Sequence, residues 1–143
     1  GADMILDFVD VGLPSSICPT EVYKEKFEQM LSRIAKENAD VAIIEIGASP
    51  LEPYNGDVAI NALREHIKCT ILSASDPYAV YGLMKAFELV PDIVTGVASN
   101  TLAGAKMVKE LCGVRALNLI DSTTTKALKE ILTEKTGMSL KTK

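Results

Sequence analysis

Residues 69–77 read Cys69-Thr70-Ile71-Leu72-Ser73-Ala74-Ser75-Asp76-Pro77. The first half of this stretch is mostly apolar, as in a strand that is buried inside a protein. In the second half, Asp76 precedes a proline, and an acidic cap followed by proline is a strong signal for the start of a helix. The stretch therefore predicts a strand that leads directly into a helix, the repeating unit of α/β proteins.

The same alternation of apolar runs and helical patterns extends along the whole chain. The apolar runs are Met4–Val11, Val41–Ile46, Cys69–Ser73, Ile93–Ala98 and Arg115–Ile120. Helices are expected from Thr20, over 57–66, over 77–89, from Asn100 or Thr101 to Gly113, and from Ser122 or Thr123 to Gly137. Because strands that alternate with helices form parallel sheets with right-handed crossovers, the sequence predicts a three-layer α/β/α fold around a mainly parallel, five-stranded, Rossmann-like sheet.

Composition limits the class of protein and of partner. The chain has 143 residues, of which 48% are hydrophobic and 24% charged, as in one globular α/β domain spanning 1–143. We expect a frayed tail over 138–143. The net charge is −4, and Lys and Arg are scattered, so nucleic acid is not expected as the main partner.

Neither a membrane segment nor a signal peptide is expected. No apolar run approaches the roughly 18 residues that a membrane-spanning helix needs, and the start at Gly1-Ala2-Asp3-Met4 lacks the basic and apolar regions of a signal peptide. We therefore expect a cytoplasmic protein. An internal Met so close to the start indicates a fragment, or the C-terminal domain, of a longer protein.

The three cysteines do not form a recognisable motif. Cys18, Cys69 and Cys112 are far apart and include no CxxC pair, so neither a disulfide framework nor a zinc site is indicated. Cys69 and Cys112 lie in apolar patterns typical of core residues. Cys18 lies in a proline-rich loop and is the one cysteine whose reactivity we would test.

A ligand site is expected where the predicted strands end. In open parallel sheets, ligands bind beyond the carboxyl ends of the strands, where helix N-termini also offer backbone N–H groups to anions. The candidate ligand-binding residues in these loops are Gly12, Ser15, Ser16, Gly47, Ser75, Asp76, Ser99, Asn100 and Asp121. Asp76, Asn100 and Ser122 are also good helix caps, which alone would explain them, and the two glycines suit tight turns.

Two acidic residues are candidates for binding a metal ion. Glu45 lies within the apolar run Val41–Ile46, where an unpaired buried carboxylate would be unfavourable unless it faced a ligand. Asp10 lies near the end of the first apolar run. Both are therefore candidate metal ligands at the rim of the sheet.

Several familiar catalytic motifs are missing from the sequence. It has no GxxxxGK[ST] loop for phosphates, no GxGxxG turn after a strand, and no GxSxG elbow. The single histidine, His66, is expected at the end of a helix and away from the rim. A Ser-His-Asp or Cys-His assembly is therefore not indicated.

Two segments resemble the later part of P-loop NTPases of the dethiobiotin synthetase and cobyrinic acid synthase type. Val41–Gly47 is similar to their apolar strand ending in an acid, and Ile93–Asn100 to their strand ending in a base-recognising Asn. Asp7–Ser16 looks like a stretch of an uncharacterised P-loop-containing family, in which it follows the nucleotide-binding first third. The resemblance implies a P-loop NTPase-like fold, with Glu45 near Mg²⁺ and Asn100 near a purine. However, the P-loop is absent, and Ile46 replaces an expected glycine.

Three functions follow as hypotheses. The first is a nucleotide- or small-anion-binding module that does not hydrolyse nucleotide by itself, with Mg²⁺ and a purine nucleotide as the implied cofactor. The second is a structural, oligomerisation or partner-docking domain, with a second copy or a missing N-terminal P-loop domain as partner. The third is a metal-assisted enzyme acting on a small anionic metabolite, with Asp10 or Glu45 as general base.

Overall fold

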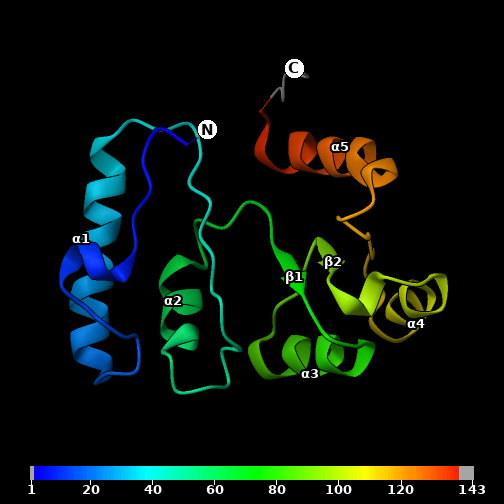
Figure 1. Ribbon diagram of the computed structural model, residues 1–143, viewed down its shortest axis with the longest axis horizontal. Helices are drawn as coiled ribbons and strands as arrows, with labels where there is room; N and C mark the ends of the chain where they lie inside the picture. Colours follow the sequence, from blue (N-terminus) through cyan, green and yellow to red (C-terminus); the bar gives the residue numbers. More distant parts are fainter. Residues whose placement is uncertain (1, 139–143) are drawn as a thin grey trace. The chain divides into compact units, whose positions relative to one another are not determined.

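The computed structural model describes residues 2–138 and divides the chain into two compact units, residues 1–66 and residues 67–143. We call them unit 1 and unit 2 (Figure 1). The part of the expected tail at 139–143 lies outside the described residues.

Unit 1 is helical. Its elements are the 3₁₀ turn η1 (Phe8–Val11) and the helices α1 (Thr20–Lys36) and α2 (Gly56–Leu63). The apolar spacing of α1 buries Tyr23 and Phe27 together with Leu13 and with Ala59 of α2. The stacked rings of Tyr23 and Phe27, with centroids 5.8 Å apart, form the centre of this small core.

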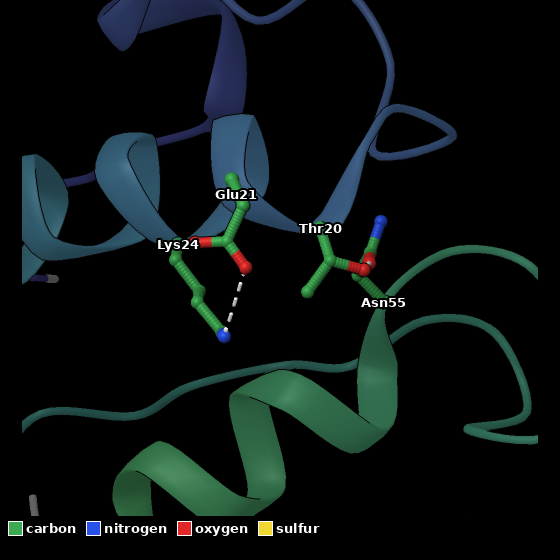
Figure 2. A network of polar contacts seen from close by, with 4 residues as sticks. All are labelled: Thr20, Glu21, Lys24 and Asn55. Atoms are coloured by element: carbon green, nitrogen blue, oxygen red, sulfur yellow. Dashed lines mark hydrogen bonds and ion pairs between the residues drawn. The ribbon is translucent and has the colours of Figure 1, made fainter.

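The residue before α2 connects three segments of unit 1. Asn55 has a left-handed backbone conformation, with φ of 58°. Its amide nitrogen donates to the carbonyl oxygens of Ser16 (2.8 Å) and Cys18 (3.1 Å). Its side-chain oxygen accepts from the Thr20 hydroxyl at 3.1 Å, and Figure 2 shows these two side chains next to the Lys24–Glu21 ion pair. Asn55 therefore fixes the loop that leads into α1.

The predicted strand at Met4–Val11 is wrong. The Asp7 carboxylate accepts from the Phe8 N–H (2.6 Å), and the Asp10 carboxylate accepts from the Asp7 N–H (2.7 Å), so the two acids form a reciprocal capping box around η1. Gly12 ends the turn with φ of 77°. These side-chain to backbone hydrogen bonds offer the chain an alternative to β pairing, and here they outweigh the β-branched residues.

The predicted strand at Val41–Ile46 is also wrong. These residues form no helix or strand, and within the described chain their backbone groups have no hydrogen-bond partner. A β-branched run needs a neighbouring strand to form a ladder, and unit 1 has no described strand to supply one.

Unit 2 contains the sheet and most of the helices. In chain order its elements are β1 (Ile71–Ser73), α3 (Pro77–Phe87), β2 (Ile93–Thr95), the 3₁₀ turn η2 (Val97–Ser99), α4 (Leu102–Cys112), the 3₁₀ turn η3 (Ser122–Thr124) and α5 (Thr125–Thr136). The strands β1 and β2 are parallel and pair Ile71 with Ile93. The strand that leads directly into a helix, predicted from residues 69–77, is therefore present as β1 and α3.

The expected sheet of five strands is not present. In place of the strand predicted at Arg115–Ile120, one parallel bridge joins Ala116 to Val94 of β2. Within residues 2–138 the sheet has two strands, so the three-layer α/β/α architecture is corrected to a largely helical fold with a small parallel sheet. A chain segment needs pairing at consecutive residues to count as a strand, and in this run only Ala116 forms a bridge.

The core of unit 2 lies between β2 and two helices that pack on each other, α3 and α4. Its buried members are Val80, Val94, Ala98, Val108 and Val114. Among residues 2–138, no helix is both long enough and apolar enough to cross a bilayer.

An ion pair joins α5 to the segment before β2. Lys135 Nζ lies 2.7 Å from Asp92 Oδ1, and Asp92 Oδ2 accepts from the Thr70 N–H at 2.8 Å. Burial acts to raise the pKa of Asp92, but donation from Lys135 and Thr70 outweighs it, so the pKa is lowered. Asp92 thus connects three segments of unit 2.

Candidate functional site

Hydrogen bonds hold the carboxyl edge of the small sheet together. The Ala98 N–H donates to the Ala74 carbonyl at 3.0 Å, which joins the loops after β2 and β1. The buried Ser99 hydroxyl lies 3.0 Å from the carbonyl oxygens of both Gly96 and Leu117. The chain segments that follow β1, β2 and the Ala116 bridge are therefore neighbours at this edge.

Five predicted ligand-binding residues belong to this part of unit 2. They are Ser75, Asp76, Ser99, Asn100 and Asp121. Ser99 is buried and occupied by structural hydrogen bonds. The Asn100 side chain is exposed and has no hydrogen-bond partner among residues 2–138.

The two aspartates at this edge are helix caps. The pKa of Asp76 is lowered by donation from the Ala79 N–H, then from the Ser75 hydroxyl and the Tyr78 N–H. The pKa of Asp121 is lowered by the Thr123 N–H and hydroxyl. Because its carboxylate already occupies the first amides of α3, Asp76 would repel an anion at that helix end.

A shallow depression of about 460 Å³ lies beside Asp121, over η3 and the first turns of α5. It is lined by Ser122, Thr123, Thr125, Lys126, Lys129 and Glu130. Lys126 lies 4.0 Å from Glu130, a weak ion pair, and Lys129 has no ion-pair partner in the described chain. Three hydroxyl groups and two ammonium groups therefore line one surface.

Sequence reasoning placed the loop at Asp121 on the rim but missed the two lysines. Their signal was a spacing of three residues, directly after a run of hydroxyl residues, in the first turns of a helix. This spacing brings side chains onto the same face of a helix.

The candidate residues before position 20 belong to unit 1 and have structural roles. Gly12 ends η1, and Asp10 completes its capping box. The Ser15 hydroxyl accepts from the Ile17 N–H at 3.1 Å, and the Ser16 carbonyl accepts from Asn55. The structure does not bring Asp10 into a group of metal ligands.

Glu45 and Gly47 lie in the segment that forms no strand. Both residues are exposed. Glu45 was a candidate ligand because it was expected to be buried among apolar residues, and it is not buried. Among residues 2–138, no three His, Cys, Asp or Glu side chains are grouped closely enough to hold a metal ion. The five loops expected on one rim also depended on the single five-stranded sheet, which is not formed.

The cysteines of unit 2 are poor candidates for nucleophiles. Burial raises the pKa of Cys69, with a further contribution from Asp92, and burial also raises the pKa of Cys112. A raised pKa keeps the group as a thiol at neutral pH, whereas the thiolate is the reactive form.

Comparisons with protein-family models, curated proteins and solved structures find no match to this chain.

Proposed function

We propose that the chain is a small-anion-binding module, and that its ligand carries a phosphate group. The observation that supports this function is the depression in unit 2, which is lined by three hydroxyl groups and by Lys126 and Lys129. An ammonium group offers three donors and a full charge to phosphate oxygens, and the hydroxyls of Ser122 and Thr125 add neutral donors. The depression is within the size range of small-molecule sites.

The ligand is expected to have a polar part as well as the anion. Glu130 also lines the depression, and a carboxylate there would repel a bare anion but accept a hydrogen bond from a hydroxyl or amino group. This favours a phosphorylated metabolite or a nucleotide over inorganic phosphate. The resemblance to P-loop NTPases makes purine nucleotides the first to test, with and without Mg²⁺.

The proposed activity is binding without hydrolysis. The depression is lined by hydroxyl groups, two lysines and one glutamate, and none of its lining residues is a His or Cys. Asp121 is adjacent in sequence, but its carboxylate is held by Thr123. This agrees with a chain that lacks the phosphate-binding loop.

The experiment is a titration of the ¹⁵N-labelled chain with ATP, GTP and inorganic phosphate, followed by NMR and calorimetry. We expect amide shifts over residues 122–130 and tighter binding of nucleotide than of phosphate. Lys129→Ala should weaken binding about tenfold or more, because a hydrogen bond to a charged group contributes about 1.5–3 kcal/mol. Lys106→Ala is the matched control, since Lys106 lies on α4 and is paired with Glu110.

Two results would contradict the proposal. One is the absence of binding by any of the three anions. The other is equal weakening by Lys129→Ala and Lys106→Ala, which would show that only the net charge of the chain matters.

A further inference from the structure

An exposed apolar segment in unit 1 has properties that anion binding in unit 2 does not explain. Residues 41–46 read Val-Ala-Ile-Ile-Glu-Ile, and the side chain of Ile43 is 93% exposed, with Val41 47% exposed. Single exposed apolar residues are common on proteins, but contiguous ones mark interaction surfaces. We call residues 41–46 the apolar segment.

The two ends of the apolar segment differ in how they are held. The side chain of Ile46 packs against Gly56, the first residue of α2. A Cβ added at Gly56 would lie only 3.2 Å from Ile46 Cγ2. Ile43 and Val41 have no such support and face solvent. In an extended chain, alternate side chains share a face, so Val41, Ile43 and Glu45 would face the same way on pairing.

The backbone of the apolar segment is free to pair. No backbone N–H or C=O of residues 41–46 has a hydrogen-bond partner within residues 2–138. Pairing with an extended peptide would satisfy these groups: main-chain hydrogen bonds would give affinity and alternate side chains specificity, as when a peptide adds a strand to the edge of a sheet.

Charge indicates the kind of partner. Residues 1–66 have 12 acidic and 5 basic residues, a net charge of −7, whereas residues 67–143 have 7 acidic and 10 basic residues, a net charge of +3. Between residues 37 and 63 the chain has five acidic residues, among them Asp40 and Glu45, and no Lys or Arg. Neither Asp40 nor Glu45 has an ion-pair partner among the described residues.

We infer that the apolar segment binds an extended segment of another protein in which β-branched residues alternate with Lys or Arg, by pairing with it as a strand. The β-branched side chains of the partner cover Val41 and Ile43, and its cations, which lie on the other face of the pair, are beside Asp40. A second copy of this chain fits poorly, because its own segment has the same acidic surroundings and like charges oppose each other across a strand pair.

The test uses the full chain and fluorescently labelled synthetic peptides, with binding followed by fluorescence anisotropy. The first peptide alternates valine and lysine, the second valine and glutamate, and the third serine and lysine. We expect only the valine–lysine peptide to bind. Methylation of its backbone nitrogens along the edge that pairs should abolish binding, because it removes the main-chain donors.

Two pairs of variants separate local contacts from general effects. Asp40→Lys should weaken binding of the valine–lysine peptide about tenfold, because the attraction between Asp40 and the lysines of the peptide is replaced by repulsion. Glu65→Lys changes the net charge equally at another exposed position of unit 1 and should have little effect. Ile43→Ser should remove binding, whereas Leu102→Ser, at a residue 92% exposed in unit 2, should not.

Three outcomes would overturn the inference. Equal binding of the serine–lysine peptide would show that apolar pairing contributes nothing. Equal weakening by Asp40→Lys and Glu65→Lys would show that only the net charge of the chain matters. Self-association that Ile43→Ser removes, without binding of the peptide, would show that a second copy covers the segment.

Discussion

Replacing Gly96 by alanine should destabilise unit 2 more than any other single methyl addition at its glycines with φ above zero. Gly96 precedes η2 with φ of 79° and ψ of −160°, a conformation that residues with a side chain rarely adopt. A Cβ added there would lie 2.8 Å from both the Ala74 carbonyl oxygen and the Ser73 Oγ, and 3.0 Å from the Ala74 nitrogen. The substitution therefore combines backbone strain with a steric clash.

The size of the effect follows from these two terms. Backbone strain of this kind costs about 1–3 kcal/mol. Relief of the clash requires the Ala74 carbonyl to move, and this carbonyl accepts the Ala98 N–H bond at 3.0 Å, worth about 1 kcal/mol. Gly96→Ala should thus lower the free energy of unfolding by about 2–4 kcal/mol.

Urea unfolding followed by far-UV circular dichroism measures the change, and hydrogen exchange of peptides from β1 and β2 locates it in unit 2. Gly82→Ala is the matched control, because Gly82 lies inside α3 and an added Cβ there has nothing within 4 Å. We expect this control to stabilise the helix by about 0.5–1 kcal/mol. A cost below about 1 kcal/mol for Gly96→Ala would refute the reasoning.

Two further predictions concern titratable groups of unit 2. The lowered pKa of Asp92 means that its contribution to stability is present above its pKa in the unfolded chain and is lost as pH falls through the folded value. Asp92→Asn should destabilise the chain by about 1 kcal/mol at neutral pH and flatten the dependence of the urea midpoint on pH below about 4. An unchanged dependence of the urea midpoint on pH in this acidic range would contradict this. Because the pKa values of Cys69 and Cys112 are raised, iodoacetamide should modify both thiols slowly at pH 7 and faster as pH increases. Mass spectrometry of the chain, labelled while folded, measures the rate. Rapid modification of either cysteine at neutral pH would show that it is a thiolate and would contradict the prediction.

Local sequence signals predicted the helices well. Asp76 accepts from the N–H groups of Tyr78 and Ala79, and Pro77 is the first residue of α3, as the Asp-Pro pair indicates. Gly113 and Gly137 end α4 and α5 with φ of 72°. Caps and terminal glycines act over a few residues of chain, so their signals are contained in the sequence itself.

Strand prediction failed where pairing depends on distant segments. The apolar segment and the run at Arg115–Ile120 both have strand-like composition, but a ladder also needs a partner in register, and composition does not identify one. At Met4–Val11 a local competitor was present in the sequence, namely two acids three residues apart that cap a 3₁₀ turn. The rim was predicted from strand ends, so it failed with the sheet. The lysine pair was not predicted because it lies on α5 and not at the end of a strand.

The register of β1 with β2 also bears on how the protein is made. Ile71 pairs with Ile93 and is separated from it by a single helix. The entropy lost in closing so short a connection is small, and contacts between nearby residues favour rapid folding. During synthesis, β1, α3 and β2 leave the ribosome before α4 and α5 do, so the two strands can pair while the later helices are still emerging.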